Sequence, residues 1–280
     1  MALLSLQQIH KTFEKGTVNE NHVLRGLDLD IEQGDFISVI GGNGAGKSTL
    51  MNSIAGVLSI DEGDILLEGQ SIKKASVDER SKDISRVFQD PRMGTATNLS
   101  IEENMAIAYR RGKKRSFFKK SITESERQVF KEALVDLGLG LENRMKTDAN
   151  FLSGGQRQAL TLAMATLVRP KILLLDEHTA ALDPKTSDMV MNLTRKIVEE
   201  QELTTLMITH NMEHAIEYGN RLVMLYHGKI VVDVRGEERK TSLLQNLWTS
   251  STKIVDKSSM TMPWYSVNNK KETIQSSDFG

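Results

Sequence analysis

The chain has 280 residues, 39% of them hydrophobic, and a formal net charge of −1 at pH 7. A charge this close to zero argues against a protein that binds nucleic acid through bulk electrostatic attraction. The sequence contains no cysteine, which excludes disulfide bonds and metal sites built from thiolates. No run approaches the roughly 18–20 apolar residues of a membrane-spanning helix, so we expect other subunits to form any path across a membrane.

The first part of the chain is predicted to alternate strands with helices. Residues 1–6 are apolar, lack a preceding basic segment and are followed by two glutamines, which favours a first strand over a signal peptide. Further strands are predicted at residues 27–31, 36–40, 65–67 and 84–88, and a helix at residues 48–57.

The second part continues the alternation. Residues 99–150 are charge-rich and predicted to be mostly helical, with one helix at 124–137 that Gly138 ends. Strands are predicted at 171–175 and 205–208, a helix at 188–200, and a hairpin of 222–226 with 230–234 around His227 and Gly228. Strands that alternate with helices predict an α/β fold with a mainly parallel sheet.

A glycine-rich segment follows the strand at 36–40. Gly41 and Gly46 stand at the G-x-x-x-x-G-K-[ST] spacing of a phosphate-binding loop, which Lys47 and Ser48 complete. Glycines let backbone N–H groups approach phosphates, the lysine can reach the β- and γ-phosphates, and Ser48 can bind Mg²⁺. The residues expected to cradle the nucleotide are Gly41, Gly42, Asn43, Gly44, Ala45, Gly46, Lys47, Ser48 and Thr49. This motif alone does not separate a transporter ATPase from a kinase.

A carboxylate pair ends the predicted strand at 171–175. Because a buried parallel strand delivers its C-terminal residues to the ligand crevice, Asp176 is expected to hold Mg²⁺ through water. Glu177 is then placed to act as general base toward the attacking water.

A second candidate phosphate cradle lies at Leu152–Gln158. Ser153 is followed by Gly154, Gly155 and Gln156 at a predicted helix start, and this arrangement offers a hydroxyl and free N–H groups to a phosphate. The chain already has one cradle, so the second indicates ATP sandwiched between two copies.

Taken in order and spacing, these motifs resemble those of the nucleotide-binding subunits of ATP-binding cassette (ABC) transporters. The resemblance covers residues 3–240 and implies a P-loop NTPase cassette with a mainly parallel sheet core, an antiparallel β subdomain and an α-helical subdomain at about residues 92–160. It also implies that the chain is an ATPase that uses ATP and Mg²⁺.

Several further residues acquire roles through this resemblance. Phe13 matches the aromatic residue that stacks on adenine, and Gln89 the glutamine that contacts Mg²⁺ and water and links to the transmembrane partner. Ser153 with its two glycines should meet the γ-phosphate held by the opposite chain. Asp183 matches the loop that crosses the dimer interface, and His210 the histidine that senses the γ-phosphate.

One position departs from the commonest family pattern. His178 stands where most cassettes have proline, beside the expected base. The loss of proline relaxes the backbone there, and an imidazole could titrate near neutrality. A tolerated variant without a separate role is the alternative interpretation.

The finer resemblance is to bacterial importer ATPases that work with a substrate-binding protein, including branched-chain and aromatic amino-acid systems. It implies a peripheral protein at the cytoplasmic face of the membrane, bound to permease subunits and to a second copy or a related cassette, and no nucleic acid. An exporter or lipoprotein-release ATPase, which the loop expected at 14–22 favours, remains an alternative. A soluble cassette acting on DNA or ribosomes is another.

Two segments stay open at this point. The basic segment at 110–120 carries two phenylalanines, and either a contact with lipid headgroups or a permease, or a solvated loop, fits its composition. Residues 241–280 form a C-terminal extension, for which partial disorder or a partner contact are the alternatives.

Overall fold

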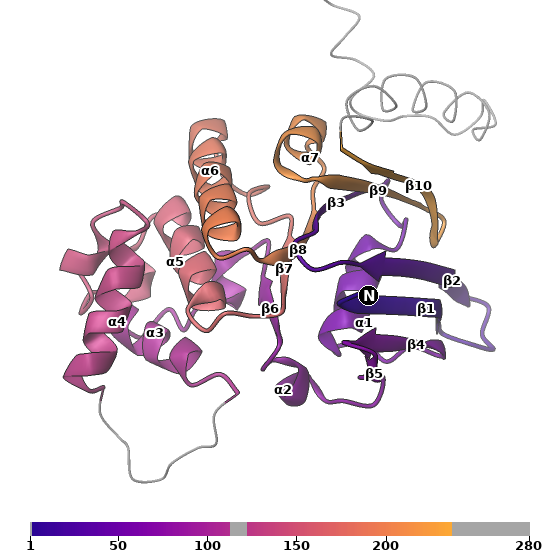
Figure 1. Cartoon of the computed structure of the whole chain (residues 1–280), viewed down its shortest axis with the longest axis horizontal. Helices are drawn as coiled ribbons and strands as arrows, with labels where there is room; N and C mark the ends of the chain where they lie inside the picture. The colour runs from indigo at the N-terminus through magenta and orange to yellow at the C-terminus, as the bar shows by residue number, and fades with distance from the viewer. Residues whose placement is uncertain (1, 113–121, 237–280) are drawn as a thin grey trace, which may run out of the picture. The chain divides into compact units, whose positions relative to one another are not determined.

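The computed structural model describes residues 2–112 and 122–236, so the extension at 241–280 and most of the basic segment lie outside the described residues. Figure 1 shows the arrangement of the strands and helices. Six strands form one sheet in the order β10-β9-β3-β8-β7-β6, in which only β10 is antiparallel to its neighbour. This confirms the predicted mainly parallel sheet. Its strands are β3 (Phe36–Ile40), β6 (Ile84–Val87), β7 (Ile172–Asp176), β8 (Thr204–Ile208), β9 (Arg221–Tyr226) and β10 (Lys229–Arg235).

A second sheet is antiparallel throughout, in the order β2-β1-β4-β5. The register of the first two strands extends to the pair Phe13 and Asn21. The second strand therefore begins before residue 27, and the loop expected over residues 14–22 is shorter than predicted. The strands are β1 (Leu4–Phe13), β2 (Asn21–Ile31), β4 (Glu62–Leu67) and β5 (Gln70–Ser71).

The longer helices follow the predicted pattern, whereas the short helices at Val77–Arg80 and Met212–Tyr218 were not predicted. The last long helix begins at Pro184, four residues earlier than predicted, because the Asp183 side chain accepts from the N–H of Thr186 at 3.1 Å and caps it. In the described part of residues 99–150, the main regular elements are helices, as predicted. The helices are α1 (Lys47–Ala55), α2 (Val77–Arg80), α3 (Ile101–Tyr109), α4 (Glu124–Val135), α5 (Gly154–Thr166), α6 (Pro184–Glu200) and α7 (Met212–Tyr218).

The side chains of the parallel strands alternate between two hydrophobic cores, one on each face of the sheet. Leu174 and Ile208 join the core that contains α1 and the antiparallel sheet. Leu173, Leu175 and Met207 point to the other face, where α3, α4, α5 and α6 pack (Figure 1). Full burial of one such side chain contributes about 1.5–3 kcal/mol. The six-stranded sheet is therefore covered by an apolar core on both of its faces.

The direction of the parallel strands decides where polar residues gather. The carboxyl ends of β3, β6, β7 and β8 lie at one edge of the sheet, because the four strands run side by side in one direction. In open α/β sheets, ligands bind outside this edge.

Candidate functional site

The loop between β3 and α1 depends on glycines. Gly41, Gly44 and Gly46 have φ angles of 155°, 76° and 106°, a region that residues with a Cβ adopt only with strain. A Cβ at Gly41 would also clash with the backbone oxygen of Leu225 in β9. Gly46 precedes α1 without a side-chain cap, so the first N–H groups of the helix lack a side-chain partner. Such a helix start favours an anion.

Lys47 is the first residue of α1, and only 6% of its surface is exposed. Its ammonium donates to the carbonyl oxygens of Gly41 and Gly42 at 2.9 and 3.1 Å. Burial lowers the pKa of Lys47, while the charges of Glu177 and Asp176 act in the opposite direction. The phosphate loop and the end of β7 therefore meet at one place.

Asp176, the last residue of β7, is held by an arginine that the sequence analysis did not single out. Arg86 of β6 donates to Oδ2 of Asp176 at 2.5 Å and to Oδ1 of Asn52 at 2.6 Å. The guanidinium also lies 4.7 Å from the centre of the Phe88 ring. This cation thus connects α1, β6 and β7.

Glu177 and His210 form a close pair at the same edge of the sheet. Oε1 of Glu177 lies 2.7 Å from Nε2 of His210, with side-chain exposures of 15% and 48%. The pair is therefore open to solvent on the histidine side. Glu177 has φ of 47°, a left-handed conformation that costs an L-residue about 1–2 kcal/mol. Its N–H donates to the carbonyl of Ile208, which ends β8.

Three other predicted residues have accessible side chains. Gln89 follows the end of β6 by two residues and is exposed, and Ser48 is exposed in the first turn of α1. Phe13 ends β1, partly exposed, with the Lys11 ammonium 5.7 Å from the centre of its ring. The exposure of all three side chains leaves them available to a ligand.

Ser153, Gly154, Gly155 and Gln156 belong to a separate group at the start of α5. Ser153 caps this helix, and its hydroxyl accepts from the N–H of Gln156 at 3.2 Å while the Gln156 amide oxygen accepts from the N–H of Ser153. A Cβ on Gly155 would clash with the methyl group of Thr186, and one on Gly154 would approach Leu182. The glycines therefore allow α5 to pack closely on the start of α6.

The residues around Ser153 make no polar contact with Lys47 or Asp176 in the described part of the chain: no hydrogen bond or ion pair joins Ser153 or Gln156 to either of them. Asp183, which caps α6, is exposed. The sequence-predicted residues thus fall into two groups, one around Lys47 and one around Ser153.

His178 is buried, which overturns the idea that it titrates near neutrality. It is 2% exposed, and its Nε2 lies 3.0 Å from Oγ1 of Thr194 in α6. Burial lowers the pKa of His178 to about 4, and the neighbouring His214 contributes to the same shift. The imidazole is therefore neutral at physiological pH.

The far end of α1 is stabilised by a buried arginine, Arg80. Arg80 is 6% exposed and donates to the carbonyl oxygens of Ser53 and Ile54 in the last turn of α1 at 2.8 and 2.9 Å. A cation at a helix C-terminus satisfies free carbonyls and complements the helix dipole. Arg80 was not predicted from the sequence, because nothing local marks it as a cap for a helix 25 residues earlier.

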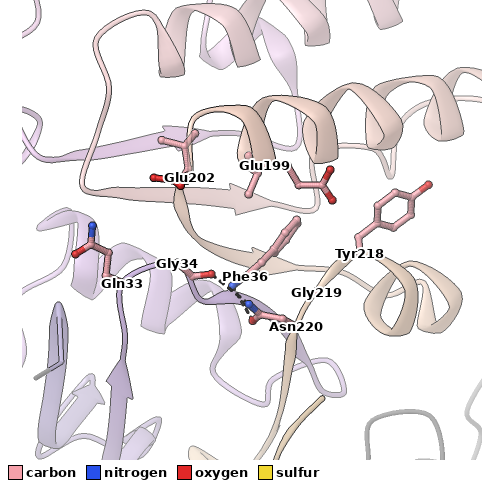
Figure 2. Close-up of a pocket in the computed structure, with 10 residues that line it drawn as sticks. Gln33, Gly34, Phe36, Glu199, Glu202, Tyr218, Gly219 and Asn220 are labelled. Carbon is pink, nitrogen blue, oxygen red and sulfur yellow. Dashed lines mark hydrogen bonds between the residues drawn. The ribbon is translucent and has the colours of Figure 1, made fainter. Parts of the chain in front are cut away.

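A cavity lies at the opposite edge of the sheet, shown in Figure 2. Phe36, the first residue of β3, lines it together with Glu199, Glu202 and Tyr218. Asn220 closes its floor by accepting from the N–H of Phe36 at 2.9 Å and donating to the carbonyl of Gly34. The cavity therefore lies at the amino ends of the strands, away from the Lys47 group.

The oxygen donors beside the phosphate loop fit a magnesium ion. Mg²⁺ prefers carboxylate, hydroxyl, carbonyl and water oxygens, and it is usually bound by one or two protein groups together with substrate phosphates. Asp176, Ser48 and Gln89 supply such oxygens, and Arg86 engages Oδ2 of Asp176. The described residues contain no cluster of three or more His, Cys, Asp or Glu, so the protein groups alone form no closed metal cage there.

In the parts of the chain that the structure covers, no helix combines the length and the apolar character needed to span a membrane.

A family model described as ABC transporter matches residues 24–180. The sequence is 42% identical over 245 residues to a tyrosine transport ATP-binding protein of Clostridioides difficile (strain R20291), which covers 88% of this chain and 97% of the relative.

Two further similarities extend this result. A phosphonates import ATP-binding protein, PhnC, of Lactobacillus gasseri is 33% identical over 252 residues, covering 88% of this chain and 93% of the relative. Among solved structures, the dimeric post-hydrolysis state of the ATP-binding cassette MJ0796 bound to ADP and Pi matches with a TM-score of 0.70 and 29% identity. It covers 83% of this chain and 98% of that structure.

Proposed function

The chain belongs to the ABC transporter family as an ATP-binding, ATP-hydrolysing subunit, and on that premise we propose that it drives the import of an amino acid through a separate permease. One observation carries the ATPase part of this proposal. Glu177 and His210 lie 2.7 Å apart at the sheet edge where the phosphate loop and the uncapped start of α1 also lie. A carboxylate there can accept a proton from a water that attacks the terminal phosphate.

Each residue of the group around Lys47 has a separate role in this proposal. Lys47 neutralises the β- and γ-phosphates, and the free N–H groups at the start of α1 bind their oxygens. Glu177 acts as general base, and His210 orients the base and contacts the γ-phosphate. Phe13 stacks on the adenine ring.

Ser48, Asp176 and Gln89 would hold a magnesium ion beside the phosphates. When bound, the ion supplies a positive charge that offsets charge developing on the phosphate oxygens. Arg86 keeps Asp176 oriented toward the loop through its bond to Oδ2. A group that hydrogen-bonds to a metal ligand commonly tunes metal affinity.

The Ser153 group completes the site in a second copy of the chain. Ser153, Gly154, Gly155 and Gln156 would meet the γ-phosphate bound to the partner, and Asp183 would lie at the interface. In an isologous dimer both sites form together. The dimeric state named for the MJ0796 cassette supports this arrangement.

Import of an amino acid is favoured over other solutes by sequence similarity. The tyrosine transport relative is 42% identical, against 33% for the phosphonate import relative, at equal coverage of this chain. We place the protein at the cytoplasmic face of the membrane, with residues 3–240 as the cassette, the segment 92–160 as its helical subdomain in contact with the permease, and an extracellular substrate-binding protein as a further partner.

The test is transport by the reconstituted complex. The chain should be coexpressed with a permease and a substrate-binding protein encoded beside it, purified, and placed in proteoliposomes. Uptake of labelled tyrosine that requires ATP on the side of this chain supports the proposal. Export of solute, or a chain that copurifies with ribosomes or DNA and with no membrane subunit, contradicts it.

A further inference from the structure

His178 is attached to the middle of α6 by a buried hydrogen bond. Its Nε2 lies 3.0 Å from Oγ1 of Thr194, which is 0% exposed. Histidines are rarely buried this fully without a partner that satisfies the ring. The bond therefore joins the residue after Glu177 to α6, a helix whose apolar side chains belong to the hydrophobic core.

The direction of this bond follows from the threonine. The Thr194 hydroxyl has one hydrogen, and it donates that hydrogen to the carbonyl of Val190 at 2.8 Å. Oγ1 is then the acceptor toward His178, so the histidine carries its proton on Nε2 and donates. A neutral imidazole with a fixed tautomer therefore forms a directional link to α6.

This link adjoins a strained residue. Glu177 has a left-handed φ of 47°, and such a conformation persists where the surroundings hold it on both sides. On the strand side, the Glu177 N–H donates to the carbonyl of Ile208 at 3.1 Å. On the other side, the next side chain along the chain is the one bonded to Thr194.

We propose that His178 is a positioning residue that acts through Thr194 to hold the Glu177 carboxylate against His210. The inference rests on the proposed role of Glu177 as general base. A proline would restrict this backbone through its ring. The histidine restricts it through a hydrogen bond to the neighbouring helix.

The experiment removes the bond from the helix side, so that the loop sequence stays unchanged. Thr194→Val keeps the volume of the side chain and removes the acceptor, and Thr194→Ser restores a hydroxyl. Thr166→Val is the matched control, because Thr166 is also buried and donates to the carbonyl four residues earlier in α5 at 3.0 Å. For each purified full chain, kcat, ATP affinity by a fluorescent analogue, and the unfolding temperature are measured.

A displaced base slows the chemical step and leaves ground-state binding alone. We expect kcat to fall roughly 10-fold or more in Thr194→Val, since a misplacement of about 1 Å costs up to 10²-fold. ATP affinity should stay within about two-fold, and Thr194→Ser should recover most of the rate. Wild-type kcat in Thr194→Val would overturn the proposal, as would an equal loss in Thr166→Val.

A double substitution separates positioning from general damage. His178→Phe removes the donor and keeps a ring, and its effect on kcat should not add to that of Thr194→Val, because the two residues act through one bond. Additive losses would overturn the proposal. Failure of the proposed function gives a different result, because Glu177→Gln would then hydrolyse ATP at the wild-type rate. An inactive Glu177→Gln beside a fully active Thr194→Val would reject only the role of His178.

Discussion

The guanidinium of Arg86 lies 2.5 Å from Oδ2 of Asp176, with side-chain exposures of only 13% and 15%. A buried ion pair is weak as a source of net stability, but removal of one partner leaves the other charge without compensation. In this chain the unpaired group would be the carboxylate proposed to face magnesium. The integrity of the site therefore depends on a residue outside every motif.

We expect Arg86→Ala to lower the free energy of unfolding of the nucleotide-free protein by about 2–4 kcal/mol. Urea unfolding measures this loss. Arg92→Ala is the control, because Arg92 lies 3.9 Å from Asp90 and both side chains are exposed, by 73% and 53%. That variant should change stability by no more than about 0.5 kcal/mol. Equal losses in the two variants would contradict the assignment.

Contiguous motifs could be predicted from the sequence, whereas the partners that hold them could not. The phosphate loop is one segment after a buried strand, so local spacing was sufficient. The partner of Asp176 depends on strand register. Arg86 pairs with Leu174, two residues before Asp176, and successive side chains point to opposite faces, so both charged groups lie on the α1 side. Periodicity alone does not reveal this register.

The environment of His178 could not be predicted from the sequence either. The departure from proline is visible in the sequence, but the burial of the imidazole depends on how α6 packs. Thr194 follows sixteen residues later along the chain, in a helix that the sequence predicted to begin one turn too late. The sequence alone therefore indicates an ordinary pKa for an imidazole that the fold removes from water.

Substitutions of Glu177 and Lys47 should have different effects on ATP binding and ATP hydrolysis. Glu177→Gln should bind ATP with nearly wild-type affinity and hydrolyse it at least about 100-fold more slowly, because an amide keeps the shape and accepts no proton. Lys47→Ala should instead lose tight binding, since it removes the cation that faces the phosphates. Affinity and turnover are measured for both. Glu213→Gln, an exposed glutamate at the start of α7, is the matched control and should retain both.

ATP should join two copies of the chain when hydrolysis is blocked. In the Glu177→Gln background, a dimer should accumulate with ATP and disappear with ADP, which light scattering can follow. Ser153→Arg should prevent it, because a bulky cation replaces the hydroxyl at the shared phosphate. Ser76→Arg is the control: Ser76 forms the same capping box on α2, so both variants lose a cap of about 1 kcal/mol. Normal dimerisation of Ser153→Arg would refute the shared site.

The buried imidazole predicts how stability depends on pH. His178 has a pKa of about 4 in the folded chain against 6.5 ordinarily, so the unfolded state binds the proton more tightly. The contribution is fully present above about pH 7 and is lost as pH falls from 6.5 toward 4. Near pH 4.5 the loss should reach about 2–3 kcal/mol.

Urea unfolding near pH 7.5 and near pH 4.5 checks this prediction. His178→Gln should lack the corresponding part of the pH dependence, whereas His227→Gln, at an exposed hairpin position, should retain it. The same pH dependence in wild type and His178→Gln would show that another group is responsible.

Coupling to the permease should depend on the exposed surface beside Gln89. Glu102 is unsuitable for testing this, because its side chain is only 13% exposed and bonded to Arg127 at 3.0 Å. Arg92 and Met93 are 73% and 70% exposed, in the short turn of helix at Pro91–Met93. Arg92→Glu should reduce uptake in proteoliposomes while the isolated chain hydrolyses ATP at nearly the wild-type rate. Lys229→Glu, the same charge change at an exposed position of β10, should leave uptake unchanged, and equal losses of uptake in both variants would exclude a specific contact at Arg92.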